Sequence, residues 1–172
     1  RPFALEQVAQ LDSKDMDGVI WQLLAARCHF WLSQEDVQSV VVTHGTDTLE
    51  ETAWFLHEVL QPSKSLVLTC AMRPATALSA DGPQNLSAAI EFAGKEDGRA
   101  GIWAVMGSKP IPGLALVKGH SSHTNAFFEE TLPDDWTQVS NDLPIPSDNQ
   151  WPWVEIITSH SGARPDTIRL LE

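Results

Sequence analysis

Basic residues are scarce in this 172-residue sequence, in which 11 Lys and Arg stand against 23 Asp and Glu for a formal net charge of −12 at pH 7. No Lys or Arg occurs between Lys118 and Arg164. Proteins that bind nucleic acids need clustered Lys and Arg to release counterions from the phosphates. The composition therefore disfavours a nucleic acid as partner, and the acidic excess is explained most simply by solubility.

Cysteines and long apolar runs are also lacking. The two cysteines, Cys28 and Cys70, form no Cys-x-x-Cys pair, which favours free buried thiols in a reducing compartment, with a single disulfide as the alternative. No apolar run reaches the ~18 residues that a membrane span needs, and residues 1–3 lack a signal-peptide pattern. We therefore expect a cytoplasmic protein without a membrane partner. The first residue is not Met, so we also expect that the natural start lies upstream.

What is present is a regular alternation of helical and strand-like segments. Apolar residues make up 42% of the chain, enough for a globular core. Helical spacing, β-branched runs and terminal signals predict, in order, an amphipathic helix from residue 15 to about 32, strand 39–43, helix 49–60, strand 65–69, helix 84–93 and strand 101–106. Thr48 and Glu51 form a candidate capping box, and Gly94 a candidate C-terminal cap. Short connections imply parallel pairing, hence an α/β fold with helices on both faces of a parallel sheet, Rossmann-like or flavodoxin-like.

The texture of the sequence changes after Glu130. Residues 131–152 are acidic, hold four prolines and show no sustained period, which is typical of a linker. Residues 153–172 contain one strand and the opening of a helix, too little to bury a core. We therefore predict three parts: an amino domain over 1–130, a linker over 131–152, and the start of a second, smaller α/β domain over 153–172.

The loop after the first predicted strand is the first candidate site, because ligands of α/β sheets bind beyond the carboxyl ends of the strands. Thr46 and Asp47 would project into the mouth of such a site. The alternative is that they only cap the helix that follows. His44 is interpreted as a packed or solvated histidine rather than a catalytic base.

Three further features could carry chemistry. The loop over 70–83 is long for a βα connection, and an ion pair between Arg73 and Asp81 would brace it. Lys118 precedes a hydroxyl-rich stretch and could act as general base for a threonine hydroxyl, although most isolated lysines are surface charges. His120 and His123 have the spacing of a metal-binding pair, but no third ligand stands out, so no metal is predicted.

Two motifs carry a resemblance to a known family. The segments Val42–Leu56, VTHGTDTLEETAWFL, and Ala71–Leu86, AMRPATALSADGPQNL, are similar to the bacterial-type L-asparaginases and glutaminases. The resemblance implies a two-domain α/β amidohydrolase that converts L-asparagine to L-aspartate and ammonia without metal or organic cofactor. It also implies a homo-oligomer, usually a homotetramer built as a dimer of dimers, with active sites between the amino domain of one subunit and the carboxyl domain of another.

The resemblance also assigns roles to residues of the motifs. Thr46 matches the second active-site threonine, and Lys118 completes a Thr–Lys–Asp cluster with Asp47, which would contact the substrate's amino group. Ser13 matches the serine that binds the substrate carboxylate. The backbone carbonyl of Ala71 would lie near the substrate amide nitrogen.

Departures from the family pattern bear on activity and substrate preference. The family's first threonine, the nucleophile, has no counterpart in this sequence, and the lid tyrosine is missing because the chain contains no tyrosine. Lys14 stands where many members carry Gln or Glu, which bears on recognition of the substrate's amino group. Gly162 replaces a polar residue that some members supply, so asparagine is favoured over glutamine.

Two alternatives to an active asparaginase remain. One is a non-catalytic module of the same family that binds an amino acid or assembles with other subunits. The other is an asparaginase-like subunit of a tRNA-dependent amidotransferase, against which the acidic charge argues.

Overall fold

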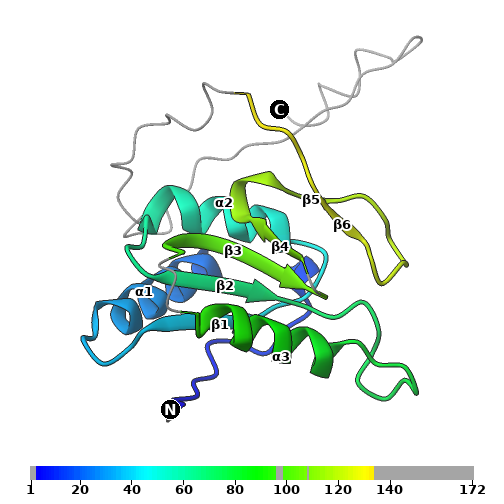
Figure 1. The fold of residues 1–172 in the computed structure, drawn as a ribbon, viewed down its shortest axis with the longest axis horizontal. Helices are drawn as coiled ribbons and strands as arrows, with labels where there is room; N and C mark the ends of the chain where they lie inside the picture. Colours follow the sequence, from blue (N-terminus) through cyan, green and yellow to red (C-terminus); the bar gives the residue numbers. More distant parts are fainter. Residues whose placement is uncertain (1–2, 96–98, 108, 134–172) are drawn as a thin grey trace, which may run out of the picture.

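The computed structural model describes residues 3–95, 99–107 and 109–133, and contains two small sheets and three α-helices (Figure 1). All six strands lie within the predicted amino domain over residues 1–130. In chain order the elements are the 3₁₀ turn η1 Ser13–Asp15, α1 Gly18–Ser33, β1 Ser39–Thr43, α2 Leu49–Leu60, β2 Ser65–Thr69, α3 Gly82–Ala93, β3 Gly101–Met106, β4 Lys109–Pro112, the 3₁₀ turn η2 Gly113–Ala115, β5 Leu116–Lys118 and β6 Phe127–Glu129.

The larger sheet has the strand order β1-β2-β3-β4. Strands β1, β2 and β3 are parallel, with Thr43 opposite Thr69 where β1 and β2 end, and β4 pairs antiparallel with β3. The smaller sheet is the antiparallel hairpin β5-β6, which contacts α2 and β4. The carboxyl ends of the parallel strands therefore share one edge, where the sequence places both candidate loops.

Both faces of the larger sheet are covered by helices, which confirms the predicted fold class (Figure 1). Side chains alternate along a strand, so the buried β2 sends Leu66 and Leu68 to one face and Val67 to the other. The first face packs against α1 and α2, with Leu56 fully buried, and the second packs against α3 through Phe92. A strand buried on both faces has no polar side, which explains its continuous apolar run.

Two predicted details of the helices are wrong. Helix α1 begins at Gly18, because Asp17 caps it by accepting a hydrogen bond from Ile20 N at 2.9 Å, and it is not amphipathic, since Val19 and Phe30 are exposed. The capping box before α2 does not form. The hydroxyl of Thr48 instead donates to the carbonyl oxygen of Ser13 at 2.7 Å, which ties η1 to the start of α2.

Strands β4, β5 and β6 escaped prediction because each has only three or four residues. The two prolines in β4 argue against a strand in the sequence. Among the residues that the structure describes, however, β4 pairs with β3 alone, and the outer edge of a sheet tolerates proline. Gly107, between β3 and β4, adopts φ +69°, a left-handed conformation that glycine reaches without strain.

Cys28 and Cys70 are both free and buried, as predicted, and burial raises the pKa of each thiol to about 12. They are therefore protonated and unreactive at neutral pH. Most of the predicted linker, the predicted unit over 153–172 and Gly162 lie outside the described residues. Within the described residues, no helix combines the length and the apolar character that crossing a membrane requires.

A pair of leucines tests the core. Leu68 is fully buried whereas Leu78 is fully exposed. We expect Leu68→Ala to lower the free energy of unfolding by about 2–5 kcal/mol, because it leaves a cavity between the sheet and α2. Leu78→Ala should stay within about 0.5 kcal/mol of the parent. Urea denaturation followed by tryptophan fluorescence measures both, and equal effects of the two substitutions would contradict the packing described.

Candidate active site

The loop after β1 continues along the carboxyl edge of the larger sheet. The amide of His44 donates to the carbonyl of Thr69 at 2.8 Å, one step beyond the ladder between β1 and β2. The chain then turns at Gly45 and enters α2 at Leu49. Thr46 and Asp47 therefore sit between the end of a strand and the beginning of a helix, as the sequence predicts.

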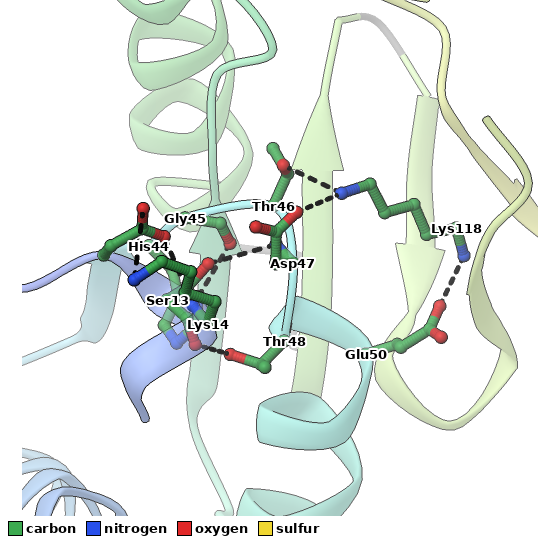
Figure 2. A network of polar contacts seen from close by, with 10 residues as sticks. Ser13, Lys14, His44, Gly45, Thr46, Asp47, Thr48, Glu50 and Lys118 are labelled. Carbon is green, nitrogen blue, oxygen red and sulfur yellow. Dashed lines mark hydrogen bonds and ion pairs between the residues drawn. The ribbon is translucent and has the colours of Figure 1, made fainter. Parts of the chain in front are cut away.

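Lys118 reaches this loop from the hairpin (Figure 2). Its Nζ lies 3.0 Å from Thr46 Oγ1 and 2.7 Å from Asp47 Oδ1, and only 16% of its side chain is exposed. The hydrogen bond and charge of Lys118 hold the pKa of Asp47 below its usual value. The structure thus brings together the three residues that the sequence nominates as a cluster.

Ser13 is buried directly beneath the same loop (Figure 2). Its Oγ accepts a hydrogen bond from Asp47 N at 3.0 Å, which leaves its own hydroxyl proton free to donate elsewhere. A Cβ at Gly45 would lie 2.4 Å from Ser13 Oγ, so glycine is needed for this close approach. Gly45, Asp47 and Thr48 together fix the position of Ser13.

Lys14 stands beside Ser13 but belongs to the surface. Its side chain is 60% exposed and pairs with Asp15 at 2.5 Å. That hydrogen bond raises the pKa of Lys14, and the charge of Lys14 makes a small contribution to lowering the pKa of Asp47. The lysine therefore lies at the margin of the cluster rather than within it.

Ala71 follows β2 by two residues, at the same sheet edge as Thr46. The loop that it opens is not braced by the predicted ion pair between Arg73 and Asp81. The guanidinium of Arg73 donates to the Ser79 carbonyl instead, and Asp81 accepts from the amides of Met72 and Arg73 at 3.0 and 2.9 Å. Burial opposes ionisation of Asp81, but these amide bonds outweigh it and lower its pKa. Because a carboxylate has two oxygens, Asp81 can accept from both backbone amides at once, which holds the loop more firmly than a bond to the mobile Arg73 side chain would.

His44 is a packed residue whose proton can be placed by donor logic. The Gly45 carbonyl can only accept, so His44 Nδ1, which lies 2.8 Å from it, carries a hydrogen. In the neutral ring Nε2 is then an acceptor, and it receives the hydroxyl proton of Thr52 at 3.1 Å, while Thr52 Oγ1 accepts from Trp21 Nε1 at 2.9 Å. Burial lowers the pKa of His44, which favours this neutral form. This chain of hydrogen bonds supports the backbone of the loop.

His120 and His123 stack ring on ring at 4.7 Å. Among the residues that the structure describes, no group of three or more His, Cys, Asp and Glu side chains is arranged to hold a metal ion. The pair therefore gains no third ligand from this part of the chain.

Comparison with known proteins decides the family. Residues 2–142 match the family model of the amino-terminal asparaginase domain, "Asparaginase, N-terminal". The chain belongs to the asparaginase family. Within it, L-asparaginase 2 of Bacillus subtilis strain 168 is 38% identical over 128 residues, which are 74% of this chain and 34% of that protein. The probable periplasmic L-asparaginase of Haemophilus influenzae is 37% identical over 183 residues, covering 96% of this chain and 52% of the relative.

The asparaginase fold is matched by a crystal structure as well. The probable cytoplasmic L-asparaginase of Campylobacter jejuni superposes with a TM-score of 0.69 at 40% identity, over 72% of this chain and 40% of that one. The chain thus spans between about a third and a half of the length of these relatives.

Two residues that help to build this candidate site went unnoticed in the sequence. Asn85 donates to the Cys70 carbonyl and accepts from Gly107 N, both at 2.9 Å, so it joins the ends of β2 and β3. Glu50 contacts the backbone of Lys118. Their partners lie 15 to 68 positions away, and no local pattern marks such contacts.

The tautomer of His44 can be measured directly. We expect long-range ¹H–¹⁵N NMR spectra at pH 7 to show a neutral ring protonated at Nδ1, with a titration midpoint below 6.5. Since the folded pKa is lowered, the stabilisation from this residue is complete above pH 6.5 and is lost as the pH falls through the folded pKa. An Nε2–H tautomer, or a midpoint above 6.5, would contradict the bonding described.

Proposed function

We propose that the protein containing this chain hydrolyses the side-chain amide of L-asparagine to L-aspartate and ammonia. The observation that carries the proposal is that Lys118 Nζ contacts both Thr46 Oγ1 and Asp47 Oδ1. Amide hydrolysis by a hydroxyl nucleophile needs a base to take up a proton, and this site places an amine, a hydroxyl and a carboxylate together. Membership of the asparaginase family supports the same reaction.

Proton transfer is assigned to Thr46 and Lys118. An attacking hydroxyl must lose its proton as it adds to the amide carbon. In this proposal Lys118 first gives up the proton of the ammonium that pairs with Asp47. The hydroxyl proton then passes to Thr46 and from there to the Lys118 amine, and it is later returned to the departing ammonia. The nucleophile is the family's first threonine, which has no counterpart in this sequence. The ester that it forms as ammonia leaves is then hydrolysed by water, which releases L-aspartate.

Substrate recognition is assigned to the residues around the cluster. Lys118 engages one carboxylate oxygen of Asp47, which is 52% exposed and retains capacity to bind the substrate ammonium. The free hydroxyl proton of Ser13 would donate to the substrate carboxylate, and the Ala71 carbonyl would accept from the amide nitrogen. The positive charge of Lys14 at the margin opposes a second ammonium, so we expect it to modulate affinity rather than turnover.

Compartment and assembly are part of the proposal rather than findings. The relatives differ in compartment, cytoplasmic for the Campylobacter protein and periplasmic for the Haemophilus protein in their descriptions. We keep the prediction of a cytoplasmic homo-oligomer with sites shared between subunits. An export signal upstream of Arg1 would reject the cytoplasmic compartment. A monomer in analytical ultracentrifugation would reject the homo-oligomer.

Substitutions in the full-length protein test the reaction. We expect Thr46→Val and Lys118→Met each to lower kcat for L-asparagine about 10²- to 10⁴-fold, because each removes a member of the proton path. Ammonia release measures kcat, and circular dichroism checks folding. Lys109→Met is the matched control, since Lys109 is exposed and pairs with Glu129 away from the cluster.

The outcomes separate the proposal from its alternatives. Normal kinetics in both variants would overturn the assignment of the cluster. A parent protein that binds L-aspartate in calorimetry but releases no ammonia would identify a non-catalytic module. Parallel assays with L-glutamine determine the preference between the two amides.

A further inference from the structure

The backbone amide of Lys118 faces away from its partner strand. Neighbouring amides along a strand point to opposite sides, and the next residue, Gly119, donates to the Ala126 carbonyl of the hairpin at 2.8 Å. Strand β5 pairs only with β6 in the described part of the chain. The Lys118 N–H is therefore left without a strand acceptor.

Glu50 supplies the missing acceptor (Figure 2). A carboxylate oxygen of Glu50 accepts a hydrogen bond from Lys118 N. Glu50 lies in the first turn of α2, where the exposed amides of the helix favour a negative charge. The five-residue segment 46–50 thus binds both nitrogens of Lys118. Thr46 and Asp47 accept from the side-chain nitrogen, and Glu50 accepts from the backbone nitrogen.

The other side of this strand end is equally constrained. A Cβ at Gly119 would lie 2.5 Å from a ring carbon of Phe128, so the chain after Lys118 packs directly against β6. With the hairpin on one side and Glu50 on the other, the Cα of Lys118 has little freedom. The long Lys118 side chain can bring Nζ to two acceptors at once only if its own backbone is held in place.

We propose that Glu50 is a positioning residue for Lys118: its carboxylate holds the backbone so that Nζ meets Thr46 and Asp47 together. The inference rests on the proposed function for its kinetic consequence, but not for the contact itself. Glu50 acts through the length of its side chain and its acceptor oxygen rather than through its negative charge. The distinction matters because a carboxamide can accept the same bond, whereas a shorter carboxylate cannot span the distance.

Four substitutions in the full-length protein test this role. Glu50→Ala removes the acceptor, Glu50→Asp keeps the charge but shortens the side chain by one methylene, and Glu50→Gln keeps the length and an acceptor oxygen. Glu51→Ala is the control, because Glu51 is exposed in the same helical turn. Each variant is assayed for kcat and KM with L-asparagine, thermal midpoint, and hydrogen exchange of the Lys118 amide by NMR.

We expect Glu50→Ala and Glu50→Asp to lower kcat about 10- to 100-fold while KM changes less than about threefold, because misplacement of Lys118 affects the chemical step. Exchange of the Lys118 amide should accelerate about tenfold or more in the same two variants. Glu50→Gln and Glu51→Ala should resemble the parent in both measurements. If Glu50→Ala fails to fold, Glu50→Asp carries the same test.

Two results would overturn the proposal. If Glu50→Asp matches the parent while Glu50→Gln loses activity, charge rather than position is what Glu50 supplies. If neither kcat nor Lys118 exchange differs between the Glu50 and Glu51 variants, Glu50 has no positioning role. A parent without asparagine turnover would reject the proposed function alone, since amide exchange then decides the role of Glu50 independently.

Discussion

The contact of Lys118 with Thr46 and Asp47 joins two parts of the molecule that belong to separate sheets in the described part of the chain. The loop belongs to the four-stranded sheet, and Lys118 belongs to the separate β5-β6 hairpin. Because Asp47 is half exposed, the ion pair is screened by solvent and contributes little to stability. Its importance is geometric: the position of the hairpin relative to the sheet sets whether Lys118 Nζ lies beside the Thr46 hydroxyl.

The surrounding residues are arranged around that requirement. Gly45 allows Ser13 to lie close to the loop, and the Thr48 hydroxyl donates to the carbonyl of Ser13 instead of capping α2. His44 supports the loop backbone from the core side. The side chains of His44 and Thr48 each bond to a backbone carbonyl, and Ser13 Oγ accepts from the backbone amide of Asp47. These contacts fix the backbone of the loop, while Thr46 and Asp47 use their side chains to bind Lys118.

The sequence predicted those parts of the structure that are marked by patterns of neighbouring residues, and it missed contacts between residues far apart in the chain. Strands β1, β2 and β3 and helix α2 were predicted with their observed bounds, because buried parallel strands carry continuous β-branched runs and helices carry a period. The short β4, β5 and β6 carry neither signal. Thr46, Asp47 and Lys118 were found through motifs, whereas the hydrogen bond between Glu50 and Lys118 spans 68 positions. Asp81 likewise accepts from backbone amides rather than from the Arg73 guanidinium. Contacts to backbone atoms leave no residue pattern to read.

The central claim is that the cluster of Lys118, Thr46 and Asp47 receives an amino-acid substrate at the carboxyl edge of the sheet. A crystal structure of the full-length protein with bound L-aspartate, the product, tests it most directly. The account predicts the ligand ammonium within about 3 Å of the Asp47 carboxylate, the ligand α-carboxylate at the Ser13 hydroxyl and its side chain beside Thr46. Aspartate bound elsewhere, with this loop unoccupied, would contradict the account.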